Sequence, residues 1–230
     1  MKRLFGFVLF LSMIVAGNAQ TTVRRNLIRA AGEGVVAVTP DQVKVTLGVT
    51  TQAANAQDAS SQNATQVAAV IDKLKQAFGT TIDIRTLYYS LSPNYNYPGG
   101  GGTPVLTGYT ASNTVEVTAT DLTIAGKIID TATQGGANRV ESLQFSLKND
   151  QAARAQALRL ASIQAKAHAD AIALGLGVHL GAVISASEGS SVQPVIYGDV
   201  RAAAATTTTP VSPGNVEIRS TVTLEIEIAP

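Results

Sequence analysis

Cysteine is absent from this chain of 230 residues. Its absence excludes disulfide bonds, thiol nucleophiles, thiolate zinc sites, iron–sulfur clusters and a lipid-modified cysteine. Exported proteins often rely on disulfides for stability. If this chain is exported, its stability must come from an ordinary hydrophobic core.

An excess of charge of one sign is also missing. The sequence has 17 basic and 16 acidic residues, and two of the basic ones, Lys2 and Arg3, lie in the N-terminal segment described below. The remainder is therefore close to neutral. Nucleic-acid binding needs a basic patch, and attraction to an anionic membrane needs a polybasic segment. The charge pattern excludes nucleic acid as a partner.

Patterns of catalytic residues are scarce. The two histidines, His168 and His179, have no second histidine or carboxylate at the i, i+4 spacing typical of metal ligands. The segment Ser187–Ser191 lacks the Gly-x-Ser-x-Gly pattern of a serine hydrolase. The carboxylates do not pair in the way that glycosidases require. We therefore expect no catalytic residue, no metal and no cofactor, and we expect that the protein is not an enzyme.

Two glycine pairs could indicate phosphate-binding loops. Gly32-Glu33-Gly34 lies inside a predicted strand and has no helix after it, and Gly175-Leu176-Gly177 follows a predicted helix. A dinucleotide-binding loop needs the order strand, glycines, helix. We interpret the first pair as a strand irregularity and the second as a helix stop.

Only one apolar run suggests targeting. Lys2 and Arg3 precede an apolar segment, Leu4–Ala16, and small residues follow up to Ala19. This is the order of a secretory signal peptide, and the run is too short to span a membrane comfortably. We expect a signal peptide over residues 1–19, one domain over residues 20–230, and no transmembrane segment once the signal is removed.

The hydrophobic periodicity predicts seven strands and three helices. Alternation with period two indicates strands, and apolar residues three or four apart indicate helices. We expect an α+β fold, with a mixed, largely antiparallel sheet, about three helices packed on it and the order β-β-α-β-β-α-β-α-β-β. A flexible loop is expected over about 188–215. The predicted strands are Ile28–Val38, Gln42–Thr50, Ile82–Leu91, Val105–Thr120, Arg139–Lys148, Val178–Ser187 and Val216–Ile228, and the helices run to Phe78 from a cap at Asn55 or Asp58, over Asp121–Gln134 and over Asp150–Leu174.

Five of the six tyrosines fall in one window beside a glycine-rich segment, Gly99–Gly102. Tyrosine next to flexible glycine is common in recognition surfaces, because the ring offers flat apolar area with a polar tip. The simpler interpretation is that these tyrosines pack on strands and the loop bridges a hairpin. The candidate partner or ligand surface consists of Tyr88, Tyr89, Tyr95, Tyr97 and Tyr109.

Several short motifs follow one another along the chain. They are Gly32-Glu33-Gly34, Pro40-Asp41-Gln42-Val43, Pro93-Asn94-Tyr95, Gly108-Tyr109-Thr110-Ala111-Ser112-Asn113-Thr114-Val115-Glu116-Val117, Gly135-Gly136-Ala137-Asn138 and Ala165-Lys166-Ala167. Together these motifs resemble the SIMPL-domain family of bacterial envelope proteins, which includes periplasmic immunogenic and oxidative-stress-defence proteins. The resemblance implies an α+β fold, export to the periplasm or outer membrane and self-association, and it implies no catalytic residue.

Three hypotheses of function remain from the sequence. The first is a non-enzymatic envelope protein that acts through self-assembly as a homo-oligomer, or through an envelope protein or glycan partner, in protection against oxidative stress. The second is an envelope ligand-binding protein or enzyme that uses the tyrosine-rich region 88–109. The third is a structural spacer.

Overall fold

The structure is a computed structural model that describes residues 26–98, 102–189, 195–196 and 209–229. The predicted signal peptide and most of the predicted loop 188–215 lie outside these ranges. Within them, no helix combines the length and the apolar character needed to cross a membrane.

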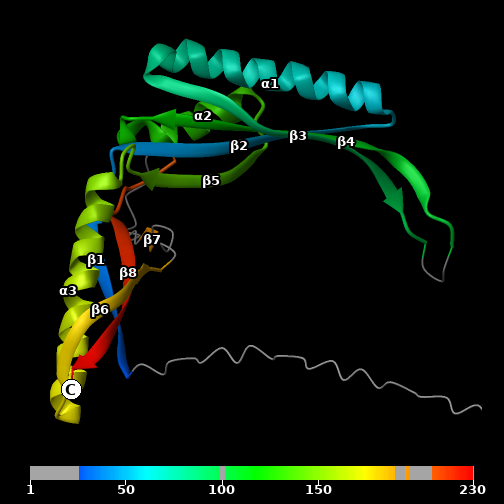
Figure 1. Ribbon diagram of the computed structural model, residues 1–230. Coiled ribbons are helices and arrows are strands. Elements are labelled where there is room, and N and C mark those ends of the chain that lie inside the picture. Colours follow the sequence, from blue (N-terminus) through cyan, green and yellow to red (C-terminus); the bar gives the residue numbers. More distant parts are fainter. Residues whose placement is uncertain (1–25, 99–101, 190–194, 197–208, 230) are drawn as a thin grey trace, which may run out of the picture.

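The fold is α+β, and the predicted order of helices and strands is confirmed (Figure 1). One short strand, β7, is additional. The elements are β1 (Leu27–Val38), β2 (Gln42–Ala53), α1 (Ala56–Phe78), β3 (Ile82–Asn96), β4 (Val105–Ala119), α2 (Ala125–Gly135), β5 (Arg139–Ser146), α3 (Gln151–Leu176), β6 (His179–Glu188), β7 (Val195–Ile196) and β8 (Val216–Ala229), with 3₁₀ turns at Gly79–Thr81 and Leu122–Ile124.

The strands form two antiparallel sheets where the sequence suggested one. The first sheet has the order β1-β8-β6, with β7 also paired to β8, and the second has the order β3-β4-β2-β5. β1 and β2 follow each other through the short connection Thr39-Pro40-Asp41 but belong to different sheets. The period-two pattern identifies strands correctly, yet it does not tell which strands pair, because both sheets bury one face in the same way.

The β3-β4-β2-β5 sheet is covered on one face by α1 and α2. Its core combines the inward side chains of β2 and β4 with the apolar stripe of α1. Asn55 caps α1 by accepting a hydrogen bond of 2.8 Å from the backbone N–H of Asp58, as predicted for this residue type. The buried side chains from β2 are Val43, Val45, Leu47 and Val49, and those from α1 include Val67, Val70 and Leu74.

The β1-β8-β6 sheet is covered by α3, which packs closely on β1. Every fourth residue of α3 is a buried alanine. Gly32 and Gly34 of β1 lie under this row, and a Cβ at Gly34 would come within 2.7 Å of the backbone nitrogen of Ala161. The row consists of Ala153, Ala157, Ala161, Ala165, Ala169 and Ala173.

The interpretation of Gly32 and Gly34 as a strand irregularity is therefore wrong. β1 pairs with β8 in one unbroken antiparallel register along its full length. Glycine is needed because the helix backbone occupies the space that a side chain would fill. The second pair does mark a helix end, but two residues later than predicted: α3 continues through Gly175 to Leu176, and Gly177 adopts the left-handed conformation of a helix cap.

Candidate functional site

The β3–β4 pair extends beyond the rest of its sheet. β2 pairs with β4 only as far as Ala53, opposite Tyr109, whereas β3 and β4 stay paired to Asn96 and Val105. Among the strands that the structure describes, none pairs with this last part beyond β3 and β4 themselves, so it is a two-stranded structure (Figure 1). We call residues 94–98 and 102–108 the ribbon.

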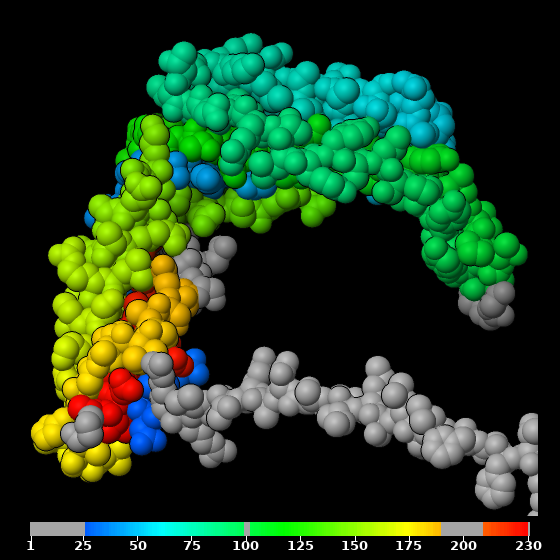
Figure 2. Space-filling view, in the orientation of Figure 1, coloured from blue at the N-terminus to red at the C-terminus, as the bar shows by residue number. Residues whose placement is uncertain are grey.

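The ribbon leaves the sheet at Gly108. A Cβ at Gly108 would approach the carbonyl oxygen of Ala53, the last residue of β2, to 2.7 Å. The β3–β4 register also shifts between Asn94 and Tyr95. A register shift of this kind bends a strand and strengthens its twist. The ribbon therefore curves away from the sheet, and Figure 2 shows a hollow between its far end and the sheet that carries α3.

Large apolar side chains of the ribbon are exposed to solvent. Tyr97 is 72% exposed and Tyr95 is 47% exposed. Their ring centroids lie 6.5 Å apart with the planes tilted by 57°, a separation within the range of favourable aromatic pairs. Val105 and Leu106 of the opposite strand are also exposed. A two-stranded structure with this composition is marginally stable alone in water and gains by packing against something else.

The remaining predicted tyrosines do not join this pair. Tyr88 and Tyr89 are neighbours on one strand, so their side chains point to opposite faces of the sheet. The Tyr89 hydroxyl lies 3.0 Å from the Ser60 hydroxyl of α1, on the helix-covered face. Tyr88, 62% exposed, is on the other face, and Tyr109 is half-buried opposite Ala53. The structure thus brings together Tyr95 and Tyr97, and separates the other three.

The two histidines are placed differently from each other. His168 lies on α3, and its Nδ1 is 2.7 Å from the carbonyl oxygen of Ala31 in β1. One helical turn earlier, Gln164 accepts a hydrogen bond from the backbone N–H of Glu33. Both bonds engage backbone groups at the outer edge of β1, so His168 has a structural role. His179 is exposed at the start of β6.

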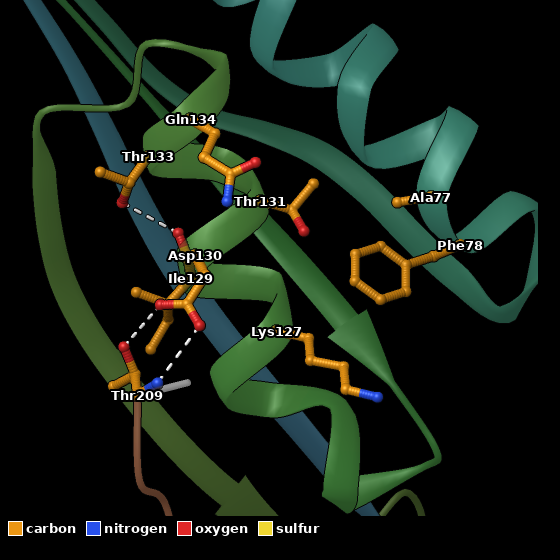
Figure 3. Close-up of a pocket in the computed structure, with 9 residues that line it drawn as sticks. All are labelled: Ala77, Phe78, Lys127, Ile129, Asp130, Thr131, Thr133, Gln134 and Thr209. Atoms are coloured by element: carbon orange, nitrogen blue, oxygen red, sulfur yellow. Dashed lines mark hydrogen bonds between the residues drawn. The ribbon is translucent and has the colours of Figure 1, made fainter. Parts of the chain in front are cut away.

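A depression that the sequence did not predict lies between the C-terminal end of α1 and α2 (Figure 3). Its volume is about 730 Å³. Thr209 closes one side: its hydroxyl donates to Asp130 over 2.7 Å, and its backbone N–H donates to the same carboxylate over 3.2 Å. The lining residues come from separate parts of the chain, so no local sequence pattern could have shown the depression. It is lined by Ala77, Phe78, Lys127, Ile129, Asp130, Thr131, Thr133, Gln134 and Thr209.

The Asp121 carboxyl, which lies near Lys127 of this depression, has a lowered pKa. Asp121, just before α2, accepts hydrogen bonds from the hydroxyl (2.6 Å) and the backbone N–H (2.9 Å) of Thr123. These bonds, with a smaller contribution from the charge of Lys127, hold the pKa of the Asp121 carboxyl below its ordinary value. Among the residues that the structure describes, no group of three histidine and acidic side chains is placed to hold a metal ion.

Comparison with known proteins gives one family. Residues 28–226 match the family model described as SIMPL, a protein of unknown function (DUF541). The chain is 30% identical over 218 residues to the 26 kDa periplasmic immunogenic protein of Brucella melitensis, which covers 91% of this chain and 87% of that protein. The protein YggE of Escherichia coli is 29% identical over 158 residues, or 69% of this chain and 63% of YggE. The chain belongs to the SIMPL family.

Proposed function

We propose that this protein is an exported, periplasmic protein without catalytic activity that acts by binding other macromolecules through the ribbon. The main support is the pair of exposed tyrosines, Tyr95 and Tyr97, on a two-stranded extension that packs on no other element within the described ranges. Exposed aromatic side chains on a projecting structure are typical of binding surfaces. The periplasmic name of the Brucella relative supports the periplasm as the location.

The first partner to test is a second copy of the chain. Burial of Tyr95 and Tyr97 against another ribbon would remove apolar area from water, and such burial is the main favourable term in protein association. We expect the exported protein to form a homo-oligomer in size-exclusion chromatography with light scattering. The variant with Tyr95→Ser and Tyr97→Ser together should shift toward the monomer at the same concentration.

The matched control for this experiment is Leu174→Ser. Leu174 is 84% exposed on α3, far along the chain from the ribbon. Its loss removes a similar exposed apolar group and should leave the oligomer unchanged. A wild-type protein that stays monomeric at high concentration would contradict self-assembly and leave an envelope protein or glycan as the partner, to be sought by pull-down from the envelope with the same variants.

The same proposal includes protection against oxidative stress, as the resemblance to oxidative-stress-defence proteins implies, and association with the outer membrane. If the ribbon carries this function, a deletion strain should be more sensitive to peroxide than its parent. The wild-type gene should restore resistance and the Tyr95→Ser, Tyr97→Ser gene should not. Equal restoration by both genes would separate the stress role from the ribbon.

A further inference from the structure

The depression between α1 and α2 has the size and the mixed lining of a small-molecule site. Its volume of about 730 Å³ lies within the range of roughly 300–1,000 Å³ that such sites occupy. Ala77, Phe78 and Ile129 give it an apolar part, while polar side chains line the rest. In Figure 3 the Phe78 ring and the aliphatic part of Lys127 border the same space.

The depression has one cationic group that a ligand can meet, the ammonium group of Lys127. It is lined by two charged side chains, Asp130 and Lys127. Both oxygens of Asp130 accept hydrogen bonds from Thr209. This carboxylate is therefore turned toward Thr209 (Figure 3), although these neutral donors leave its negative charge in place. Within the described part of the chain, Lys127 forms no ion pair. Its side chain is exposed, and its charge makes only a minor contribution at Asp121, so the ammonium group can also meet an anion.

Two neutral hydrogen-bonding groups accompany Lys127. Thr131 and Gln134 follow it on α2 and line the same depression. In Figure 3 both side chains project from α2 on the side that faces α1. One cation with a hydroxyl and an amide is enough to hold a single carboxylate. A phosphate group, in contrast, is usually held by a row of backbone N–H groups or by several cations.

We propose that this depression binds a small organic carboxylate with an apolar body. The apolar body packs against Phe78 and Ala77, and the carboxylate meets the ammonium group of Lys127. This site is distinct from the ribbon, because none of its lining residues belongs to the ribbon or to the predicted tyrosine set. Binding here can therefore be tested separately from association through the ribbon.

The experiment uses three probes of the same shape: 4-phenylbutyrate, the neutral 4-phenylbutanol and the cationic 4-phenylbutylamine. Each is titrated into the isotope-labelled protein, and amide chemical shifts are followed by NMR. We expect 4-phenylbutyrate to bind most tightly and the amine least. The largest shifts should fall on residues 77–78 and 127–134. Equal binding of the three probes, or shifts centred elsewhere, would overturn the proposal.

Substitutions of Lys127 sharpen the test. Lys127→Gln should weaken 4-phenylbutyrate binding about threefold to fivefold, as expected for one exposed ion pair. Lys127→Glu should reverse the order of the acid and the amine. Lys166→Gln, an exposed lysine on α3 paired with Asp170, is the control and should bind like the wild type. An unchanged preference for the acid in Lys127→Glu would refute the assigned role.

Discussion

Two edge strands of this protein, β1 and β3, differ in whether other side chains cover their outer edges. β1 ends the β1-β8-β6 sheet, and two side chains of α3, Gln164 and His168, hydrogen-bond to its outer backbone groups. β3 ends the other sheet and carries exposed apolar side chains along its length. An exposed apolar edge is a template for pairing with another chain, and proteins usually block it. The comparison suggests that β1 is protected from association and β3 is left available for it.

The difference depends on how near a helix comes to each strand. Gly32 and Gly34 leave room for the alanine row of α3, so the helix backbone lies directly over β1. At this short distance, side chains of α3 can reach around to the edge of the sheet. The ribbon part of β3 and β4 extends past the end of β2, and no helix is packed on it among the described residues. Close packing therefore decides which edge is blocked.

The largest loss of stability is expected from Gly34→Ala, which disturbs the packing of α3 on β1. The new Cβ would come within 2.7 Å of the backbone nitrogen of Ala161, and a helix backbone cannot move aside as a side chain can. We expect a loss of about 3 kcal/mol in the free energy of unfolding, at the upper end for overpacking. Urea unfolding measures it. Gly175→Ala is the control. Gly175 lies within α3, but its new Cβ would meet no other atom, so the substitution should be neutral or stabilising by up to about 1 kcal/mol.

A second change acts from the helix side of the same contact. Ala161→Leu places a large side chain where the residue is fully buried against β1, and we expect a loss of about 2 kcal/mol. Ala167→Leu lies on the exposed part of α3 and should change stability by less than about 0.5 kcal/mol. Equal effects of the two substitutions in thermal unfolding would show that α3 does not pack as described.

A smaller change removes the protection of the β1 edge and leaves its packing in place. Gln164→Ala deletes the acceptor for the Glu33 N–H, and we expect a loss of about 1 kcal/mol, the usual net value of one hydrogen bond. The Glu33 amide should also exchange faster with deuterium. Gln156→Ala, at an exposed position of α3, should have neither effect, because alanine favours a helix at least as well as glutamine. An equal loss there would show that the Gln164 result does not depend on the bond to Glu33.

The smallest expected effect on stability comes from the ribbon. Tyr97 is 72% exposed, so Tyr97→Ser should change the free energy of unfolding of the monomer by no more than about 0.5 kcal/mol. Unfolding at low protein concentration measures this value. A larger loss would mean that the ring supports the fold, and the case for Tyr97 as a free binding group would fail.

The local pattern of the sequence predicts the elements well. The alternation in β2 and β8, the stripe of α1 and the cap at Asn55 all depend on neighbouring residues, and the structure confirms them. Contacts between residues far apart in the chain could not be predicted from these local patterns. Gly32 lies far from Ala165 in the chain. The need for glycine at position 32 therefore becomes clear only when the strand and the helix are packed together.

The candidate sites show the same limit. The tyrosine window includes the ribbon, but the extra residue at the register shift between Thr86 and Tyr88 helps decide which ring points to which face. Only the folded chain brings Phe78 close to Lys127. A single sequence therefore identifies composition that suits binding, whereas the direction of each side chain depends on register and packing.

Hydrogen–deuterium exchange at increasing protein concentration tests the central claim most directly. If β3 and the ribbon form the association surface, backbone amides of residues 87–97 and 105–108 should gain protection as the concentration rises. Amides of β1 around residues 31–34 should be protected already at low concentration and should not change. Protection that grows in β1, or in neither strand while the protein associates, would contradict the account.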